Sequence, residues 1–229
     1  MWRVELQGAK FDLARLAKAF DTGDPRVVRD GDRYLLEASE FAEAPDHGAL
    51  LTRAVQLLTM LNGLAVLESE THRAVATTGK IIGPDKQVQV LLAGTAHIRT
   101  EVYPATITVD GQAQQQPAPP ISRAARTSAA GNADAEAVIR LLGGPLDWVN
   151  LYRILDHLRH ALGGISGIVE AGYATEADLK KFKHTANSYA AIGDSARHGA
   201  DGSKPPADPM TFEEARTLIR SIVRRWLAS

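Results

Sequence analysis

The residues best suited to chemistry lie close together in one segment towards the C-terminus. Between positions 180 and 198 the sequence places Lys180, Lys183, His184, Asn187, Asp194, Arg197 and His198. Imidazole groups transfer protons near neutral pH, and ammonium and guanidinium groups bind phosphate oxygens. If residues 175–198 form a single helix, these side chains share one face, with Arg197 at its edge. A break at Ser188 or Gly193 would scramble this geometry. The pattern predicts ligand binding by Lys183, His184, Asn187, Asp194, Arg197 and His198. The alternative is a solvated face, in which an Asp194–Arg197 pair only holds the following loop in place.

A second polar cluster lies in the helix predicted to begin at Pro145. Arg153, His157 and His160 are spaced i, i+4 and i+7, so they share one face, with Asp156 beside them. Two histidines alone do not define a metal site, and we expect no metal here. If the chain has a catalytic site, its candidates are Arg153 with His160, or Arg197 with His198. A surface or interface stripe is the alternative for this cluster.

The last predicted helix carries an arginine at every fourth position, at Arg216, Arg220 and Arg224. Three aligned guanidinium groups can contact a phosphate backbone. The alternative, which we favour, is that the arginines lie on the solvent-exposed face of an amphipathic helix and pair with carboxylates on a neighbouring element.

Several sites that are recognisable from sequence are missing. The chain has no cysteine, which excludes disulfides, thiolate metal sites and a cysteine nucleophile. It has no phosphate-binding glycine loop of either common kind and no nucleophile elbow, so no cofactor is expected. His47, His72 and His97 are isolated in sequence, and we expect surface or hydrogen-bonded histidines at these positions.

Composition describes an ordinary globular chain of 229 residues with 26 basic and 27 acidic side chains, a net charge of −1. The expected partners are a second copy of the chain, another protein or RNA, although this charge balance does not by itself indicate RNA. Charges interrupt the N-terminus at once, so no signal peptide is expected. The longest apolar stretch, residues 49–67, is too short and too polar to predict a membrane span. We therefore expect a cytoplasmic bacterial protein without a membrane partner.

The elements that position these residues fall into two parts. Residues 1–110 predict an α+β domain, with alternating strand patterns at 2–6, 27–36, 88–92 and 98–109 and helical spacing at 11–20 and 46–64. One or two helices on a mostly antiparallel sheet is the simplest arrangement. Asp30-Gly31-Asp32 predicts a hairpin turn, and Asp46 a helix N-cap.

The second part is a helical domain at residues 132–229, separated from the first by a Gln/Pro/Ala-rich linker at 111–131. Asn132, Thr175 and Thr211 are predicted N-caps, the last two with an acidic residue three positions later. Gly143-Gly144 and Gly163-Gly164 are predicted helix ends. We expect four or five helices in an all-α bundle.

The C-terminal region resembles an uncharacterised bacterial family. The resemblance rests on the signature F-x-x-T-A-N at 182–187, G-D-x-A-R-H-G at 193–199, P-M-T-x-x-E-A at 209–215 and W-L at 226–227. The helical domain also resembles HEPN domains, many of which are metal-independent ribonucleases of toxin and phage-defence systems. Their arginine and histidine lie four to six residues apart on a helix and are usually completed across a dimer. Arg153 and His160, with six residues between them, fit the upper limit of that spacing, whereas Arg197 and His198 are adjacent. The polar residue that usually follows the arginine directly is replaced by Ile154.

Two functions are therefore expected from the sequence. The first is a non-enzymatic binding, regulatory or interaction protein that recognises its partner through the 180–198 segment. The alternative is a metal-independent ribonuclease of the HEPN type. In that case histidine would act on the ribose 2′-hydroxyl and arginine would stabilise the charge on the phosphorus centre.

Overall fold

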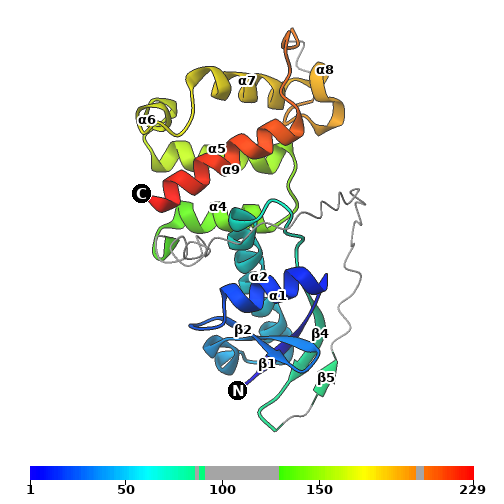
Figure 1. Ribbon diagram of the computed structural model, residues 1–229. Helices are drawn as coiled ribbons and strands as arrows, with labels where there is room; N and C mark the ends of the chain where they lie inside the picture. The colour runs from blue at the N-terminus through cyan, green and yellow to red at the C-terminus, as the bar shows by residue number, and fades with distance from the viewer. Residues whose placement is uncertain (86–87, 91–128, 200–203) are drawn as a thin grey trace, which may run out of the picture.

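The N-terminal half of the computed structural model is a five-stranded antiparallel sheet with two long helices (Figure 1). The structure describes residues 1–85, 88–90, 129–199 and 204–229. The strand order is β2-β3-β1-β4-β5. The strands are β1 (Arg3–Gln7), β2 (Arg26–Asp30), β3 (Arg33–Glu37), β4 (Ala76–Ile82) and β5 (Val88–Val90). The expected strands at 98–109, and His97, lie outside the described residues.

The local patterns of the sheet follow from the sequence. In β1, Val4 and Leu6 are buried and alternate with more exposed neighbours. Strands β2 and β3 pair with Asp30 opposite Arg33, so Gly31 lies in the predicted hairpin turn at φ +63°. Helix α1 (Lys10–Ala19) packs against β2, and α2 (His47–Glu68) packs against β4. Asp46 caps α2 by accepting a hydrogen bond from the Ala49 backbone nitrogen at 2.8 Å.

The C-terminal half is all helical, so the expected fold class is confirmed in both parts. Its elements are α4 (Ala133–Gly143), α5 (Trp148–Ala161), α6 (Ile165–Glu170), α7 (Glu176–Asn187), α8 (Tyr189–Ile192), the short 3₁₀ turn η2 (Gly193–Ser195) and α9 (Phe212–Ala228). Another 3₁₀ turn, η1 (Ser39–Glu43), precedes α2. The predicted caps Asn132, Thr175 and Thr211 are all present, and Thr211 forms a full capping box with Glu214.

Two helix boundaries differ from the expectation. The helix after Pro145 begins only at Trp148, because the Asp147 side chain accepts a hydrogen bond from the Asn150 backbone and fixes the N-cap there. The segment 175–198 is not one helix, because α7 ends at Asn187 and Ser188 has an extended backbone. Short helix α6, which the sequence pattern did not predict, fills the turn between α5 and α7.

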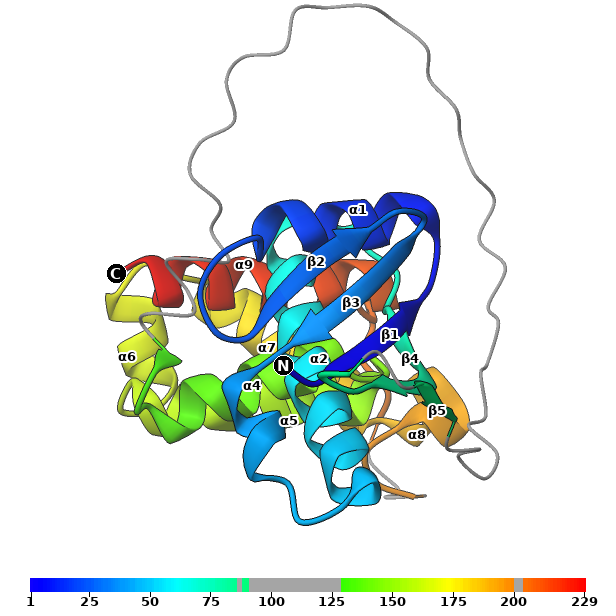
Figure 2. The ribbon, with the colours of Figure 1, turned by 90° about the horizontal axis from the view of Figure 1, so that it is seen from below.

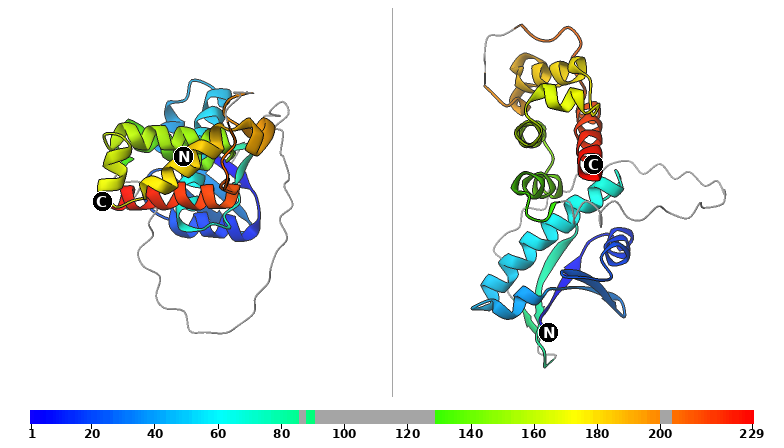
Figure 3. Two further views of the ribbon diagram at one scale, coloured as in Figure 1. Left: turned by 90° about the horizontal axis from the view of Figure 1, so that it is seen from above. Right: turned by 90° about the vertical axis from the view of Figure 1, so that its left-hand side faces the viewer.

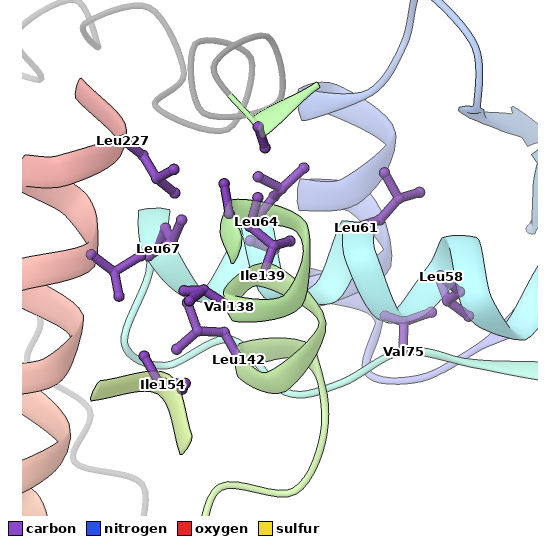
Figure 4. Packing of buried hydrophobic residues seen from close by; sticks show 14 of the residues in the cluster. Leu58, Leu61, Leu64, Leu67, Val75, Val138, Ile139, Leu142, Ile154 and Leu227 are labelled. Atoms are coloured by element: carbon purple, nitrogen blue, oxygen red, sulfur yellow. The ribbon is translucent and has the colours of Figure 1, made fainter. Parts of the chain in front are cut away.

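The two halves share one hydrophobic core. Helix α4 lies on α2, and Leu64 and Leu67 of α2 face Val138 and Leu142 of α4 (Figure 4). Ala129, in the last part of the predicted linker, is also buried in this core. Figure 3 shows the C-terminal end of α2 reaching the helical half, with α9 beside it.

Helix α2 and helix α4 approach so closely that only glycine fits at two positions. A Cβ atom on Gly63 would lie 1.9 Å from the Ile139 carbonyl oxygen, and one on Gly143 would lie 1.8 Å from the Thr59 carbonyl oxygen. These glycines therefore allow backbone-to-backbone contact between the two halves.

Helix α9 makes a polar contact with α2 as well. Arg220, which is 5% exposed, pairs with Glu70 at 2.7 Å and donates to the Leu67 carbonyl oxygen at 3.3 Å. Burial, with a smaller contribution from Arg224, lowers the pKa of Arg220 to about 10. Arg216 pairs with Glu213 at 2.8 Å. Both arginines are therefore paired with carboxylates, but only Arg220 has its partner outside α9, and Arg220 is buried rather than on the solvated face that the sequence predicted.

Among the described residues, one helix is long and apolar enough by length and composition to cross a membrane. This helix is α2, with 22 residues and a mean hydropathy of 1.5. It is longer than the apolar stretch recognised in the sequence, and half of the qualifying window is buried inside the protein.

Candidate functional site

The predicted face along residues 180–198 does not exist as one surface. Because the helix breaks at Ser188, the residues after the break leave the axis of α7. Asp194 lies in η2 with an exposed side chain, and Arg197 and His198 follow in an irregular segment. The structure therefore separates Lys183, His184 and Asn187 on α7 from the remaining three predicted ligand-binding residues.

The α7 part of the predicted face holds the chain's own following segment. The His184 Nε2 donates to the Lys204 carbonyl oxygen at 3.0 Å, and Lys181 pairs with Asp208 at 2.5 Å. The buried Thr185 hydroxyl accepts a hydrogen bond from the Met210 backbone nitrogen at 2.9 Å. Much of the polar signature at 181–211 thus has a structural use, since it fastens residues 204–210 along α7.

Asn187 and Lys183 also interact with each other. The Asn187 side-chain amide donates to the Lys183 carbonyl oxygen at 2.8 Å, one helical turn back. The Asn187 Oδ1 and the neighbouring Ser188 hydroxyl are buried without a hydrogen-bond partner in the described part of the chain. These two atoms lie at the break, where the regular hydrogen-bond pattern of α7 ends.

Arg197 connects the end of α7 to α5, through its backbone on α7 and its side chain on α5. Its backbone nitrogen donates to the Ala186 carbonyl oxygen at 2.9 Å, which places the side chain over α5. The guanidinium carbon then lies 4.2 Å from the centre of the Tyr152 ring, a cation–π contact, and Nη2 is 3.9 Å from Asp156 Oδ2. Nη1 donates to His198 Nε2 at 3.3 Å. Arg197 and His198 are both exposed.

His157 and His160 share one carboxylate, that of Asp134 near the start of α4. The His157 Nδ1 donates to Asp134 Oδ1 at 2.9 Å, and the His160 Nδ1 donates to Oδ2 at 2.6 Å. These hydrogen bonds, led by that from His157, lower the pKa of Asp134. They also fix the tautomer of each neutral ring, so Nε2 carries the free lone pair. The His160 side chain is 82% exposed, which leaves its Nε2 open to solvent.

Helix α5 brings both candidate pairs onto one exposed face. Arg153, His157 and His160 form one stripe, as predicted, and Arg153 is exposed with a hydrogen bond to Asn150 at 3.2 Å. Tyr152, Asp156 and Arg159 recur with the same spacing on the adjacent stripe, and this second stripe carries Arg197 and His198. We call this set the α5 face. Its charged and titratable members are Asp134, Arg153, Asp156, His157, Arg159, His160, Arg197 and His198.

Sequence reasoning missed three members of the α5 face, Asp134, Tyr152 and Arg159. The position of Asp134 relative to the turn between α4 and α5 could have identified it as a neighbour of His157. Helices α4 and α5 form an antiparallel pair around a short glycine-containing turn centred near position 145, so residue 134 lies opposite residue 157. Nothing local identifies Tyr152 as the platform for Arg197, because that contact depends on the break after α7.

No group of three or more acidic or histidine side chains in the described part of the chain has the geometry of a metal site. Outside the helical half, His47 lies at the surface edge-on to Trp2, with ring centres 5.2 Å apart. His72 is buried, and its Nε2 lies 3.0 Å from Asn62 Oδ1. Both agree with the expectation of surface or hydrogen-bonded histidines.

Helix α5 lies between α4 and α7 and contacts both (Figure 1), and the view from below shows the N-terminal sheet in front of the helical half (Figure 2). No protein-family model, curated protein or solved structure matches this chain.

Proposed function

We propose that this protein is a non-enzymatic binding protein that holds single-stranded RNA by its phosphates on the α5 face. The observation that carries the proposal is that Arg153, Arg159, Arg197 and three histidines lie on two adjacent stripes of α5. Guanidinium groups match phosphate oxygens in charge and geometry. Arg153 and Arg197 are exposed, so a backbone can reach them without a change of fold.

The charge of the α5 face supports an anionic partner. Its three arginines face two aspartates, Asp134 and Asp156, so the set carries one net positive charge when the histidines are neutral. Both aspartates already have partners within the protein, Asp134 with two histidines and Asp156 with Arg159 at 3.0 Å. This local excess differs in sign from the whole chain, whose net charge is −1.

The test is fluorescence anisotropy with a labelled single-stranded RNA of about 20 nucleotides over a series of salt concentrations. The double variant Arg153→Ala/Arg197→Ala should bind more weakly. If both arginines contact phosphates, the slope of log K against log salt should fall by about 1.4, because each contact to a single strand contributes about 0.7.

The matched control removes two arginines from the other half of the molecule. Arg29 and Arg33 are exposed on the β2–β3 hairpin, and Arg29→Ala/Arg33→Ala changes the net charge equally. RNA affinity that is equal in both double variants would refute the α5 face as the binding surface. A wild-type protein that binds no RNA would refute the proposal itself.

A metal-independent ribonuclease is the second candidate, and the His160–Asp134 contact favours it. A carboxylate on Nδ1 orients an imidazole and stabilises its charged form, which is how histidine bases are commonly supported. The exposed Nε2 of His160 is then the atom that would take the proton of a ribose 2′-hydroxyl. Arg153, on the same stripe of α5, would stabilise the negative charge that develops at phosphorus.

The two candidates are separated by incubating the protein with total bacterial RNA in EDTA. Cleavage that is lost in Arg153→Ala/His160→Ala and retained in Arg197→Ala/His198→Ala would establish the enzyme and locate its centre. RNA that is bound but remains intact would support the binding protein. Circular dichroism on each variant checks that the fold is preserved.

A further inference from the structure

A groove runs along α9 on a part of the helical half that the α5 face does not include. Two cavities of about 490 and 560 Å³ adjoin there, since Asp178 and Leu218 line both. One side is formed by the α6–α7 turn and the start of α7, and the other by the outer stripe of α9. From Glu213 to Arg225 the α9 side is about 18 Å long at 1.5 Å per residue. Figure 1 shows α7 above α9 in the helical half, with α5 behind α9.

The floor of the groove is apolar. Leu218 of α9 is only partly buried, and Val169, Tyr173 and Ala174 from the α6–α7 turn are partly buried around it. These side chains rest on the core, so the floor is rigid underneath and open to solvent above. An apolar floor of this length fits the apolar stripe of a helix of about 12 residues.

The rim of the groove is acidic. Glu176, Asp178, Glu213 and Glu214 line it, against two cations, Lys181 and Arg225. Lys181 pairs with Asp208 at 2.5 Å and Glu213 pairs with Arg216 at 2.8 Å, whereas Arg225 donates to the Gly172 carbonyl oxygen at 2.8 Å and keeps its charge. The four carboxylates still outnumber the two cations that line the groove. Glu176 is exposed and has no hydrogen-bond or ion-pair partner among the described residues. The groove therefore presents negative charge around an apolar floor.

We propose that this groove is a docking site for a partner protein that presents a basic amphipathic helix. The apolar stripe of that helix would lie on Leu218 and Tyr173, and its lysines or arginines would face Glu176 and Glu213. Charge complementarity selects a cationic peptide over an acidic one or a nucleic acid, because phosphates would meet the carboxylates of the rim. This site is separate from the α5 face and stands whether or not RNA binds there.

The experiment measures binding of a labelled synthetic peptide of about 14 residues to the full chain. Leucines at the i, i+3, i+4 and i+7 spacing form one face and lysines the rest. A second peptide has glutamate in place of every lysine. We expect the lysine peptide to bind with an affinity that falls as salt rises, and the glutamate peptide to bind at least 10-fold more weakly. Equal binding of both peptides, or no binding of the lysine peptide, would overturn the proposal.

Two variants with the same chemical change localise the peptide. Thr217→Lys/Glu176→Lys places two cations in the groove, at exposed positions where little packing is lost. Thr52→Lys/Glu43→Lys makes the same substitutions at exposed positions of the other half. The groove variant should weaken peptide binding by at least 10-fold, and the control by less than about 2-fold. A similar loss in both variants would show non-specific attraction to net charge and would refute the groove.

Discussion

At the scale of single residues, Asp134 organises more of the α5 face than any side chain recognised from sequence. One carboxylate accepts hydrogen bonds from two histidines that lie one turn apart on another helix. It therefore sets the orientation and tautomer of both rings and joins α4 to α5. An asparagine at this position keeps the size of the side chain but loses both the charge and the second acceptor oxygen.

We predict that Asp134→Asn destabilises the protein by about 1 kcal/mol at pH 7, as expected for a partly exposed hydrogen-bonded charge. The pKa of Asp134 is lowered on folding, so its stabilisation is present above its ordinary value of 3.8 and is lost as the pH falls through the folded-state value. Urea unfolding of both proteins between pH 7 and pH 3 should show the difference closing below about pH 4. Asp32→Asn, at an exposed turn residue, is the control and should show almost no difference at either pH.

His72 gives a second pH-dependent prediction. Its side chain is fully buried, Nε2 donates to Asn62 Oδ1 at 3.0 Å, and Nδ1 lies 3.3 Å from Asp12 Oδ1 without an aligned hydrogen bond. Burial lowers the pKa of His72 below 6.5, against the opposing effect of Asp12. The unfolded chain thus takes up a proton first as the pH falls, so stability is lost below about pH 6.5. His72→Gln should reduce the slope of unfolding free energy against pH between 7.5 and 5.5. An unchanged slope would contradict this.

At the scale of elements, the crossing of α2 and α4 depends on Gly63 and Gly143. A methyl group at either position would meet a backbone carbonyl oxygen of the other helix at less than 2 Å, and a backbone atom cannot rotate away. We predict that Gly63→Ala and Gly143→Ala each cost at least about 2 kcal/mol of unfolding free energy, although alanine favours a helix. Gly48→Ala on α2 meets only the side chain of Asp46 and should be close to neutral. Denaturant unfolding of the three variants checks the order.

The elements also show which parts of the fold a sequence predicts well. Local signals were sufficient for the caps Asp46, Asn132 and Thr211, because a capping side chain bonds to a backbone only a few residues away. Ser188 was one of two positions at which the sequence allowed a break, but the helical spacing of apolar residues continues through it and favoured a single helix. The Arg197 backbone nitrogen donates to the Ala186 carbonyl oxygen there, and Arg197 lies eleven residues further along the chain. Because the helix breaks there, the Arg197 side chain contacts α5. The prediction of a single helix over 175–198 therefore also misplaced part of the candidate site.

At the scale of the whole molecule, composition separates the chain into two parts, whereas the buried side chains of both parts pack together. The change in composition at 111–131 predicts two domains, and the described residues on either side contribute to one cluster of buried side chains. A polar, proline-rich composition indicates that a segment is exposed to solvent. It does not indicate which helices on either side of that segment pack together. Only the pair of glycines at positions 63 and 143 points to the contact, and glycine also occurs within helices and at their ends where no second helix approaches.

The shared core leads to the last prediction, that both halves unfold together. The chain has three tryptophans, with Trp2 in the sheet half and Trp148 and Trp226 in the helical half. In Trp148→Phe/Trp226→Phe, fluorescence reports the sheet half, whereas far-ultraviolet circular dichroism is dominated by helices on both sides. We expect one denaturant midpoint from both signals, because separating α2 from α4 and Arg220 from Glu70 would expose apolar surface and leave a buried cation unpaired. The reciprocal variant Trp2→Phe should behave in the same way. Two resolved midpoints in either variant would mean that the halves are independently stable, and that the α2–α4 contact is a docking interface rather than part of a common core.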